Sequence, residues 1–248
     1  PSAAAPLPAR QAAIKAIEKG QIGYTPATGI APLKERIARH YREKYNEEVD
    51  PARVIVTTGS SAGFILAFLS LFNEGERVAI PSPGYPAYRN ILKALSLEPV
   101  EIETDAQSRW VVTPQALEAE HSRKSIHGAL IANPNNPNGT MMQPDAFAAL
   151  IEKSRELNIR FISDEIYHGL TYDFPEETAL KYCDESIIIN SFSKYFSMTG
   201  WRVGWMVLPE AMVTTAERLT QNLYISAPAV SQIAIRFAFS DQLPSVAV

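Results

Sequence analysis

Short apolar runs alternate along the chain with longer segments in which apolar residues recur every three or four positions. The short runs are rich in β-branched residues and are mostly apolar throughout, which is typical of strands that are covered on both faces. Seven such runs occur, at residues 54–58, 77–82, 100–104, 128–133, 160–165, 186–191 and 203–208.

The longer segments have the spacing of amphipathic helices and lie between many of the runs. They are found at residues 31–45, 61–72, 86–96 and 143–158, and the segment 209–239 is also helical by pattern, with a break near "SAP". Alternation of strands and helices predicts an α/β fold. We expect a mostly parallel sheet of about seven strands, with helices on both faces, in a single domain.

Composition narrows the function classes. The 248 residues are 46% hydrophobic and 20% charged, as in ordinary soluble globular proteins. A net charge of −4 gives no sign of nucleic-acid binding, and no apolar run approaches the roughly 20 residues that span a bilayer. The first residues lack the pattern of a signal peptide.

The single cysteine, Cys183, cannot form an internal disulfide. We therefore expect a reducing, cytoplasmic environment and no catalytic role for Cys183.

In open parallel sheets, ligands bind beyond the carboxyl ends of the strands. The first strand ends in "TTGSSAG", where a helix begins with Ser60, Ser61 and Ala62. Backbone N–H groups and hydroxyls at a helix N-terminus favour anion binding. An ordinary serine helix cap explains the same residues.

The second strand ends in "PSPGYPAY". Two prolines and a glycine surround Tyr85 and restrict the backbone, so that this aromatic ring can stack on a planar ligand. A packed loop tyrosine is the alternative.

The segment "ANPNNPNGTM" contains two prolines and four asparagines, of which Asn135, Asn136 and Asn138 follow the fourth strand closely. An asparagine side chain both donates and accepts hydrogen bonds, so Asn136 can bind a phenolic oxygen or a carboxylate. A turn requires fewer of these residues, although a turn before the next helix remains the simpler alternative.

In "FISDEIYHG", Asp164 ends an apolar strand and Tyr167 follows three residues later. A carboxylate in such a place needs a partner, and a protonated ring nitrogen is one candidate. A salt bridge or a helix cap is the alternative. A metal site formed with Glu165 and His168 has little support, because no second cluster of metal-binding residues accompanies it.

The segment "SFSKYFSMTGWRVGW" leaves the sixth strand at Ser191. Ser191 and Arg202 are suited to a phosphate, Arg202 through its fork of donors. A neighbouring cation and partial shielding from water favour the neutral, nucleophilic amine of Lys194. An ordinary solvated lysine at the end of a strand is the alternative. Together, the strand ends match the requirements of pyridoxal 5′-phosphate (PLP).

These segments, together with "YTPATGIAPLKERIARHY" and "SDEIYHGL", resemble the class I aminotransferases of PLP fold type I, in the aspartate aminotransferase superfamily. The resemblance covers about residues 21–210. It implies that residues 1–248 form the PLP-binding large domain, without the N-terminal segment and C-terminal small domain of that family. It also implies that the arginine that binds the substrate's α-carboxylate lies in the missing part.

The resemblance assigns roles to individual residues. Lys194 is expected to form the Schiff base, Asp164 to pair with the ring nitrogen, and Tyr85 to stack on the ring. Asn136 and Tyr167 are expected to hold the phenolic oxygen. The expected phosphate-binding residues are Ser60, Ser61, Ala62, Ser191 and Arg202, with Ser193 as a further hydroxyl, and Tyr24 from the neighbouring subunit of a homodimer.

The implied activity is transfer of an amino group from an L-amino acid to a 2-oxo acid, with Lys194 moving a proton as base and then acid. Two departures bear on it: Asn138 stands where threonine is common, and Asn222 stands near the place of an arginine that aspartate-specific members use. Other possibilities are a β-eliminating C–S lyase, an amino-acid decarboxylase, or a PLP-binding module without turnover. An aminotransferase-like transcription regulator would need a basic DNA-binding domain, which we do not find.

Overall fold

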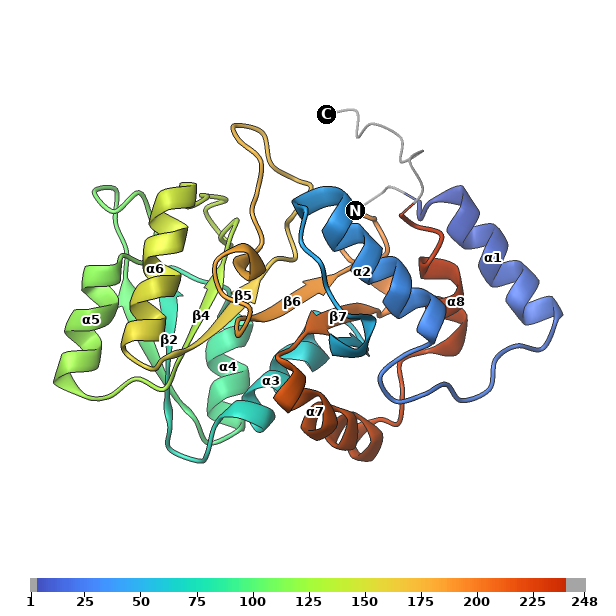
Figure 1. Cartoon of the computed structure of the whole chain (residues 1–248), viewed down its shortest axis with the longest axis horizontal. Coiled ribbons are helices and arrows are strands. Elements are labelled where there is room, and N and C mark those ends of the chain that lie inside the picture. The colour runs from blue at the N-terminus through green and yellow to red at the C-terminus, as the bar shows by residue number, and fades with distance from the viewer. Residues whose placement is uncertain (1–3, 240–248) are drawn as a thin grey trace. The chain divides into compact units, whose positions relative to one another are not determined.

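The computed structural model describes residues 4–239 and has a mixed α/β architecture over that range (Figure 1). All seven predicted strands are present, which confirms the α/β prediction. Their bounds are β1 Val54–Thr57, β2 Arg77–Ser82, β3 Glu98–Glu103, β4 Gly128–Ala132, β5 Arg160–Asp164, β6 Ile187–Ser191 and β7 Gly204–Val207. The hydrogen-bonding order is β1-β7-β6-β5-β4-β2-β3. Strand β1 pairs antiparallel with β7, and the pairs of β2 with β3 and β4, and of β5 with β4 and β6, are parallel.

The chain divides into two compact units, which we name the split unit (Pro1–Gly63 with Asn190–Val248) and the central unit (Phe64–Ile189). The expectation of a single domain stays a prediction. Helix α3, Ser60–Leu71, and strand β6 each have residues in both units.

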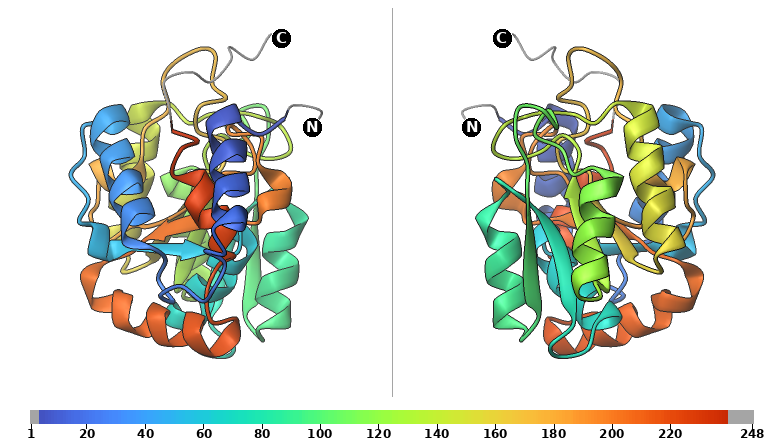
Figure 2. Two further views of the ribbon diagram at one scale, coloured as in Figure 1. Left: turned by 90° about the vertical axis from the view of Figure 1, so that its right-hand side faces the viewer. Right: turned by 90° about the vertical axis from the view of Figure 1, so that its left-hand side faces the viewer.

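In the central unit, helices connect parallel strands. Helix α4 (Pro86–Ala94) connects β2 to β3, α5 (Pro114–Arg123) connects β3 to β4, and α6 (Pro144–Glu156) connects β4 to β5. The chain moves in one direction across the sheet for α4 and in the other for α5 and α6. Because such crossovers are right-handed, α4 covers one face of these strands and α5 and α6 cover the other, as Figure 2 (right) shows.

Strand register brings the carboxyl ends of the central strands to one edge. Ala132, the last residue of β4, is the register partner of Asp164, the last residue of β5. Residues that follow the two strands therefore start from neighbouring positions. This is the edge at which ligands bind in parallel sheets.

In the split unit, helices pack around the β1–β7 pair. Helix α2 (Ala31–Tyr45) has the predicted bounds, and the other helices are α1 (Leu7–Glu18), α7 (Glu210–Leu223) and α8 (Ala229–Ile235). Helices α1 and α8 lie side by side (Figure 2, left). The Trp205 indole, on β7, donates a 3.0 Å hydrogen bond from Nε1 to the Tyr41 hydroxyl of α2, and both side chains are buried. This bond satisfies the polar atoms of two large core residues.

Three short 3₁₀ helices complete the described structure, at Pro51–Arg53, Ala179–Lys181 and Thr199–Trp201. The predicted break near "SAP" is found between α7 and α8. Within the described range, no helix combines the length and the apolar character that crossing a membrane requires.

Candidate functional site

In the central unit, Asp164 ends β5 with its carboxylate inside the protein. The side chain is 3% exposed. The Tyr88 hydroxyl, on α4, donates a hydrogen bond to Oδ2, and the backbone N–H of Ile166 donates to Oδ1 over 3.1 Å. A carboxylate placed in this way is oriented by donors at both oxygens.

Asn136 and Tyr167 lie together, as the sequence predicts for two residues that hold one oxygen. Asn136 Nδ2 donates to the Tyr167 hydroxyl oxygen over 3.1 Å. Partial burial, followed by the charge of Asp164 and the nearby Tyr85, raises the pKa of Tyr167, while the Asn136 hydrogen bond opposes that shift. Tyr167 is therefore a neutral hydroxyl near neutral pH.

Tyr85 lies directly before α4, and the residue is 41% exposed. Its ring meets the Tyr88 ring edge-on, with ring centroids 5.4 Å apart and planes at 86°. This contact fixes one edge of Tyr85 and leaves a substantial part of the residue open to a ligand. An exposed aromatic ring held in this way is suited to stacking on a planar molecule.

The loop after β4 is held by hydrogen bonds of its own asparagines. Asn135 is buried and donates from Nδ2 to Asn138 Oδ1 over 2.6 Å. His168 Nε2 lies 3.0 Å from the Asn133 carbonyl oxygen. His168 therefore contacts the asparagine loop. Among residues 4–239, no group of three or more His, Cys, Asp or Glu side chains is arranged to hold a metal ion.

Glu165, next to Asp164, is completely buried. Its Oε1 accepts hydrogen bonds from Ser163, Thr178 and the backbone of Ala179, at 3.2, 3.0 and 2.9 Å. Its Oε2 lies 3.6 Å from His168 Nδ1 and accepts no hydrogen bond from the described part of the chain. Burial raises the pKa of Glu165 to about 8, against the effect of these donors.

In the split unit, Gly59 and Arg202 are in close contact. A Cβ added at Gly59 would overlap the Arg202 guanidinium, so this position requires glycine, and its φ of 85° also favours glycine. Arg202 donates to the carbonyl oxygens of Thr199 and Thr58, at 3.0 and 3.5 Å. The guanidinium is exposed and lies beside the residue that precedes α3.

Arg202 has a φ of 52°, in the left-handed region that few residues other than glycine adopt. Such backbone strain persists where the surrounding structure enforces it, and it is frequent at ligand sites. Gly204, two residues later, lies close to the Ser60 backbone N and the Asn190 carbonyl oxygen, which are 2.9 and 2.7 Å from the position of an added Cβ. The start of β7 and the start of α3 are thus packed against each other without a side chain at Gly204 between them.

Two serines leave β6 beside this turn. The Oγ atoms of Ser191 and Ser193 are 2.8 Å apart, and the Ser193 backbone N–H donates to Ser191 Oγ over 3.0 Å. Ser191 is buried and Ser193 is half-buried. Lys194 follows them and is exposed, and its carbonyl oxygen accepts from the Ser197 backbone over 3.0 Å.

The start of α3 and the turn after β6 supply the donor set that the sequence predicts for a phosphate. Backbone N–H groups begin a helix of 12 residues at Ser60, with Ser61 exposed and Ala62 half-buried. Hydroxyls and one guanidinium accompany them, and this chemistry fits a phosphate dianion. In the central unit, a buried carboxylate near an Asn–Tyr pair fits a protonated ring nitrogen and a phenolic oxygen. The residues present therefore fit PLP.

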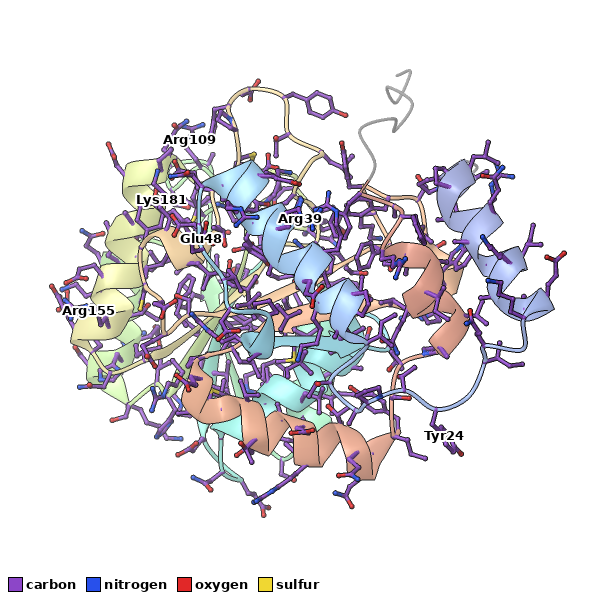
Figure 3. All side chains as sticks on the ribbon, turned by 45° about the vertical axis from the view of Figure 1, so that its right-hand side comes forward. Tyr24, Arg39, Glu48, Arg109, Arg155 and Lys181 are labelled. Atoms are coloured by element: carbon purple, nitrogen blue, oxygen red, sulfur yellow. The ribbon has the colours of Figure 1, made fainter. Side chains whose placement is uncertain are left out.

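Tyr24 lies on the loop between α1 and α2, where Figure 3 shows its side chain pointing away from the ribbon. It is 86% exposed.

Tyr88 is the site residue that sequence reasoning missed. Its hydrogen bond to Asp164 joins two segments 76 residues apart, which no local pattern reveals. The available signal was its position three residues after Tyr85, one helical turn along α4.

Comparison with known proteins identifies the relatives of this chain. The model of the family "Aminotransferase class I and II" matches residues 2–245. The chain is 44% identical to the valine–pyruvate aminotransferase of Mycobacterium tuberculosis and 34% identical to the (5-formylfuran-3-yl)methyl phosphate transaminase of Methanocaldococcus jannaschii. These matches cover 98% and 96% of this chain and 62% and 61% of the relatives. The chain thus spans about three fifths of the length of these curated relatives.

Solved structures show the same similarity. A crystal structure of an aminotransferase from Mycobacterium tuberculosis superimposes with a TM-score of 0.94 at 45% identity, covering 97% of this chain and 62% of that one. The aspartate aminotransferase of Thermus thermophilus with maleate gives a TM-score of 0.93 at 26% identity, covering 98% and 63%.

Proposed function

Because the chain belongs to the aminotransferase class I and II family, we propose that it binds PLP and acts in the transfer of an amino group from an L-amino acid to a 2-oxo acid. The observation that carries the proposal is the buried Asp164 carboxylate at the end of β5. Tyr167, three residues later in the chain, accepts a hydrogen bond from Asn136. Family membership gives this arrangement its interpretation, since the family in general depends on PLP.

In this proposal, the central unit holds the cofactor ring. Asp164 accepts a hydrogen bond from the protonated ring nitrogen, Asn136 and Tyr167 donate to the phenolic oxygen, and Tyr85 stacks on the ring. Hydrogen bonds donated to both oxygens favour the ionised form of Asp164 and orient the carboxylate for this contact.

The split unit holds the phosphate and the reactive amine. The phosphate accepts hydrogen bonds from the start of α3 and from side chains of the turn after β6. These residues are Ser60, Ser61, Ala62, Ser191, Ser193 and Arg202. Lys194 provides the amine that attaches the cofactor covalently.

Bound PLP supplies an electron sink for the negative charge that develops at the substrate's Cα. The substrate amine would first displace Lys194 from the cofactor, and the freed amine of Lys194 would then remove the proton from that Cα and deliver it, as a general acid, to the cofactor's C4′ carbon. Asp164 holds the proton on the ring nitrogen throughout, which keeps the sink effective.

The proposed assembly is a homodimer, in which Tyr24 reaches the phosphate bound by the partner subunit. Its 86% exposure supports a role outside its own subunit. The single cysteine fits a reducing compartment, and we place the protein in the cytoplasm. The relative that is 44% identical is named a valine–pyruvate aminotransferase, so valine and pyruvate are the first substrate pair to test. Asn222 in place of arginine disfavours aspartate.

Covalent mapping tests the proposal without relying on turnover. The purified 248-residue chain is incubated with PLP, reduced with borohydride, digested and examined by mass spectrometry. We expect pyridoxyl modification of Lys194 that is lost in Lys194→Ala and retained in Lys19→Ala, which removes an exposed lysine at the end of α1. Modification of surface lysines in equal measure, with none preferred, would contradict the proposal. Formation of pyruvate and ammonia from cystathionine, without amino transfer to an oxo acid, would indicate the lyase instead.

A further inference from the structure

Tyr88 contacts two residues that the proposed function assigns to the cofactor ring. Its hydroxyl donates to Asp164 Oδ2, and its ring packs edge-on against Tyr85 at 5.4 Å. The residue is 1% exposed. The Phe64 ring, 5.1 Å away at 70°, holds it from another side. Tyr88 therefore has one position, and that position is fixed by packing rather than by a ligand.

The hydroxyl of Tyr88 is a donor in this contact. Burial, followed by the charge of Asp164, raises the pKa of Tyr88 well above its ordinary value, so the phenol keeps its proton. A hydrogen bond donated to a carboxylate stabilises the ionised form and makes the carboxylate a weaker base. The second donor on Asp164, the Ile166 backbone N–H, cannot be altered by a change of side chain. Tyr88 is thus a donor on this carboxylate that a side-chain substitution can remove.

The basicity of Asp164 matters because two bases compete for one proton. A carboxylate and a ring nitrogen share a proton according to their relative basicities. A weaker carboxylate base leaves the proton on the ring nitrogen, and a stronger one attracts it away. The electron sink depends on the protonated ring.

We propose that Tyr88 is a positioning residue that weakens Asp164 as a base and thereby keeps the shared proton on the nitrogen of the PLP ring. This inference rests on the proposed function, because it requires PLP at Asp164. It assigns to α4 a part in setting the electronic state of the cofactor, in addition to carrying Tyr85.

The test is Tyr88→Phe, which removes the hydroxyl and retains the ring that Phe64 and Tyr85 contact. The chain is loaded with PLP carrying ¹⁵N in the ring, and the nitrogen resonance is recorded by NMR. In the variant we expect the resonance to shift from the protonated toward the unprotonated position. The matched control is Tyr41→Phe, which removes another buried tyrosine hydroxyl, the acceptor of the Trp205 N–H, and should leave the ring-nitrogen resonance in the wild-type position.

A Tyr88→Phe resonance identical to wild type, with Lys194 modified normally, would overturn the inference. Failure of wild-type Lys194 to bind PLP would instead overturn the proposed function.

If Tyr88→Phe does not fold, ¹³Cζ-labelled tyrosine in the chain without cofactor provides the second measurement. The Tyr88 resonance, identified through its contacts with the Phe64 ring, should shift between wild type and Asp164→Asn. An unchanged resonance would show that the hydroxyl does not sense the carboxylate.

Discussion

The side-chain nitrogen of Asn136 donates to the hydroxyl oxygen of Tyr167 over 3.1 Å, although the two residues are 31 positions apart. Asn136 follows β4 and Tyr167 follows β5, and these strands are parallel neighbours. The pairing of two strands therefore brings two polar side chains to one point. Two donors that converge in this way are suited to binding a single oxygen atom.

The first prediction is that Asn136→Ala and Tyr167→Phe weaken PLP binding non-additively. Each change removes a donor to a charged oxygen, which is worth ~1.5–3 kcal/mol, and we expect each to raise the dissociation constant by about tenfold or more. Because each residue also orients the other, the loss of PLP-binding free energy in the double variant should be smaller than the sum of the losses in the two single variants. Fluorescence titration with PLP measures the dissociation constants of wild type, the two single variants and the double variant. Tyr172→Phe, at a tyrosine that is 83% exposed, is the control and should bind as wild type. Strict additivity would contradict a shared oxygen.

The second prediction concerns the pH dependence of stability. The pKa of Glu165 is raised from 4.5 to about 8 in the folded protein by burial. Between these values, the unfolded chain has lost the proton and the folded chain keeps it, so stability falls as pH rises, by up to ~1.4 kcal/mol per pH unit. Below pH 4.5 and above pH 8 this contribution is constant. Urea unfolding at pH 5.5 and 7.5 measures the difference.

Glu165→Gln removes the titration and preserves the size of the side chain. Between pH 5.5 and 7.5, the free energy of unfolding of the variant should fall by less than that of wild type. The stability of the variant relative to wild type should therefore be higher at pH 7.5 than at pH 5.5. Glu185→Gln, at an exposed glutamate of the same unit, should retain the wild-type pH dependence. Parallel curves for wild type and Glu165→Gln would show that Glu165 is ionised in the folded protein throughout this range.

The periodicity of apolar residues was sufficient to predict the strands but not every helix. Most of the apolar runs are buried along nearly their whole length, so their pattern is strong, whereas β3 alternates buried Val100 and Ile102 with exposed glutamates. Helix α2 has the predicted bounds because Leu33, Ile37 and Tyr41 form a regular buried stripe. Helix α5 was not predicted, since Leu117 is its single buried residue. Helix α1 was also missed, because its buried residues are alanines and its larger apolar side chains are exposed.

The site shows the same division between local and non-local information. Residues at strand ends, such as Asp164 and Asn136, were predictable because the position of the end follows from the apolar run. The Tyr88–Asp164 hydrogen bond and the Gly59–Arg202 contact were not, since each joins segments that meet only in the folded chain. The roles assigned to these residues stay predictions until the cofactor is bound.

The third prediction separates the strain at Gly59 from its contact with Arg202. Gly59→Ala should destabilise the fold by ~1 kcal/mol, because φ is 85°, and should also displace the guanidinium that an alanine Cβ overlaps. Gly75→Ala is the matched control: its φ is 79°, but nothing lies within 4 Å of the added Cβ. Both variants should lose similar stability in urea, and only Gly59→Ala should bind PLP more weakly. Equal PLP affinity in the two variants would show that Arg202 does not need its present position.

The fourth prediction is that Arg202 discriminates for the phosphate of the cofactor. Arg202 is exposed, lies beside the start of α3 and offers a planar fork of donors, which a lysine cannot reproduce. Arg202→Lys should therefore weaken PLP binding by about tenfold and leave the binding of pyridoxal, which lacks the phosphate, nearly unchanged. Titration of wild type and variant with both compounds gives the ratio of their dissociation constants for PLP and the same ratio for pyridoxal. Arg109→Lys, at an exposed arginine of the central unit, controls for a general change of charge geometry. If Arg202→Lys weakened both compounds equally, the arginine would support the fold of the turn rather than bind the phosphate.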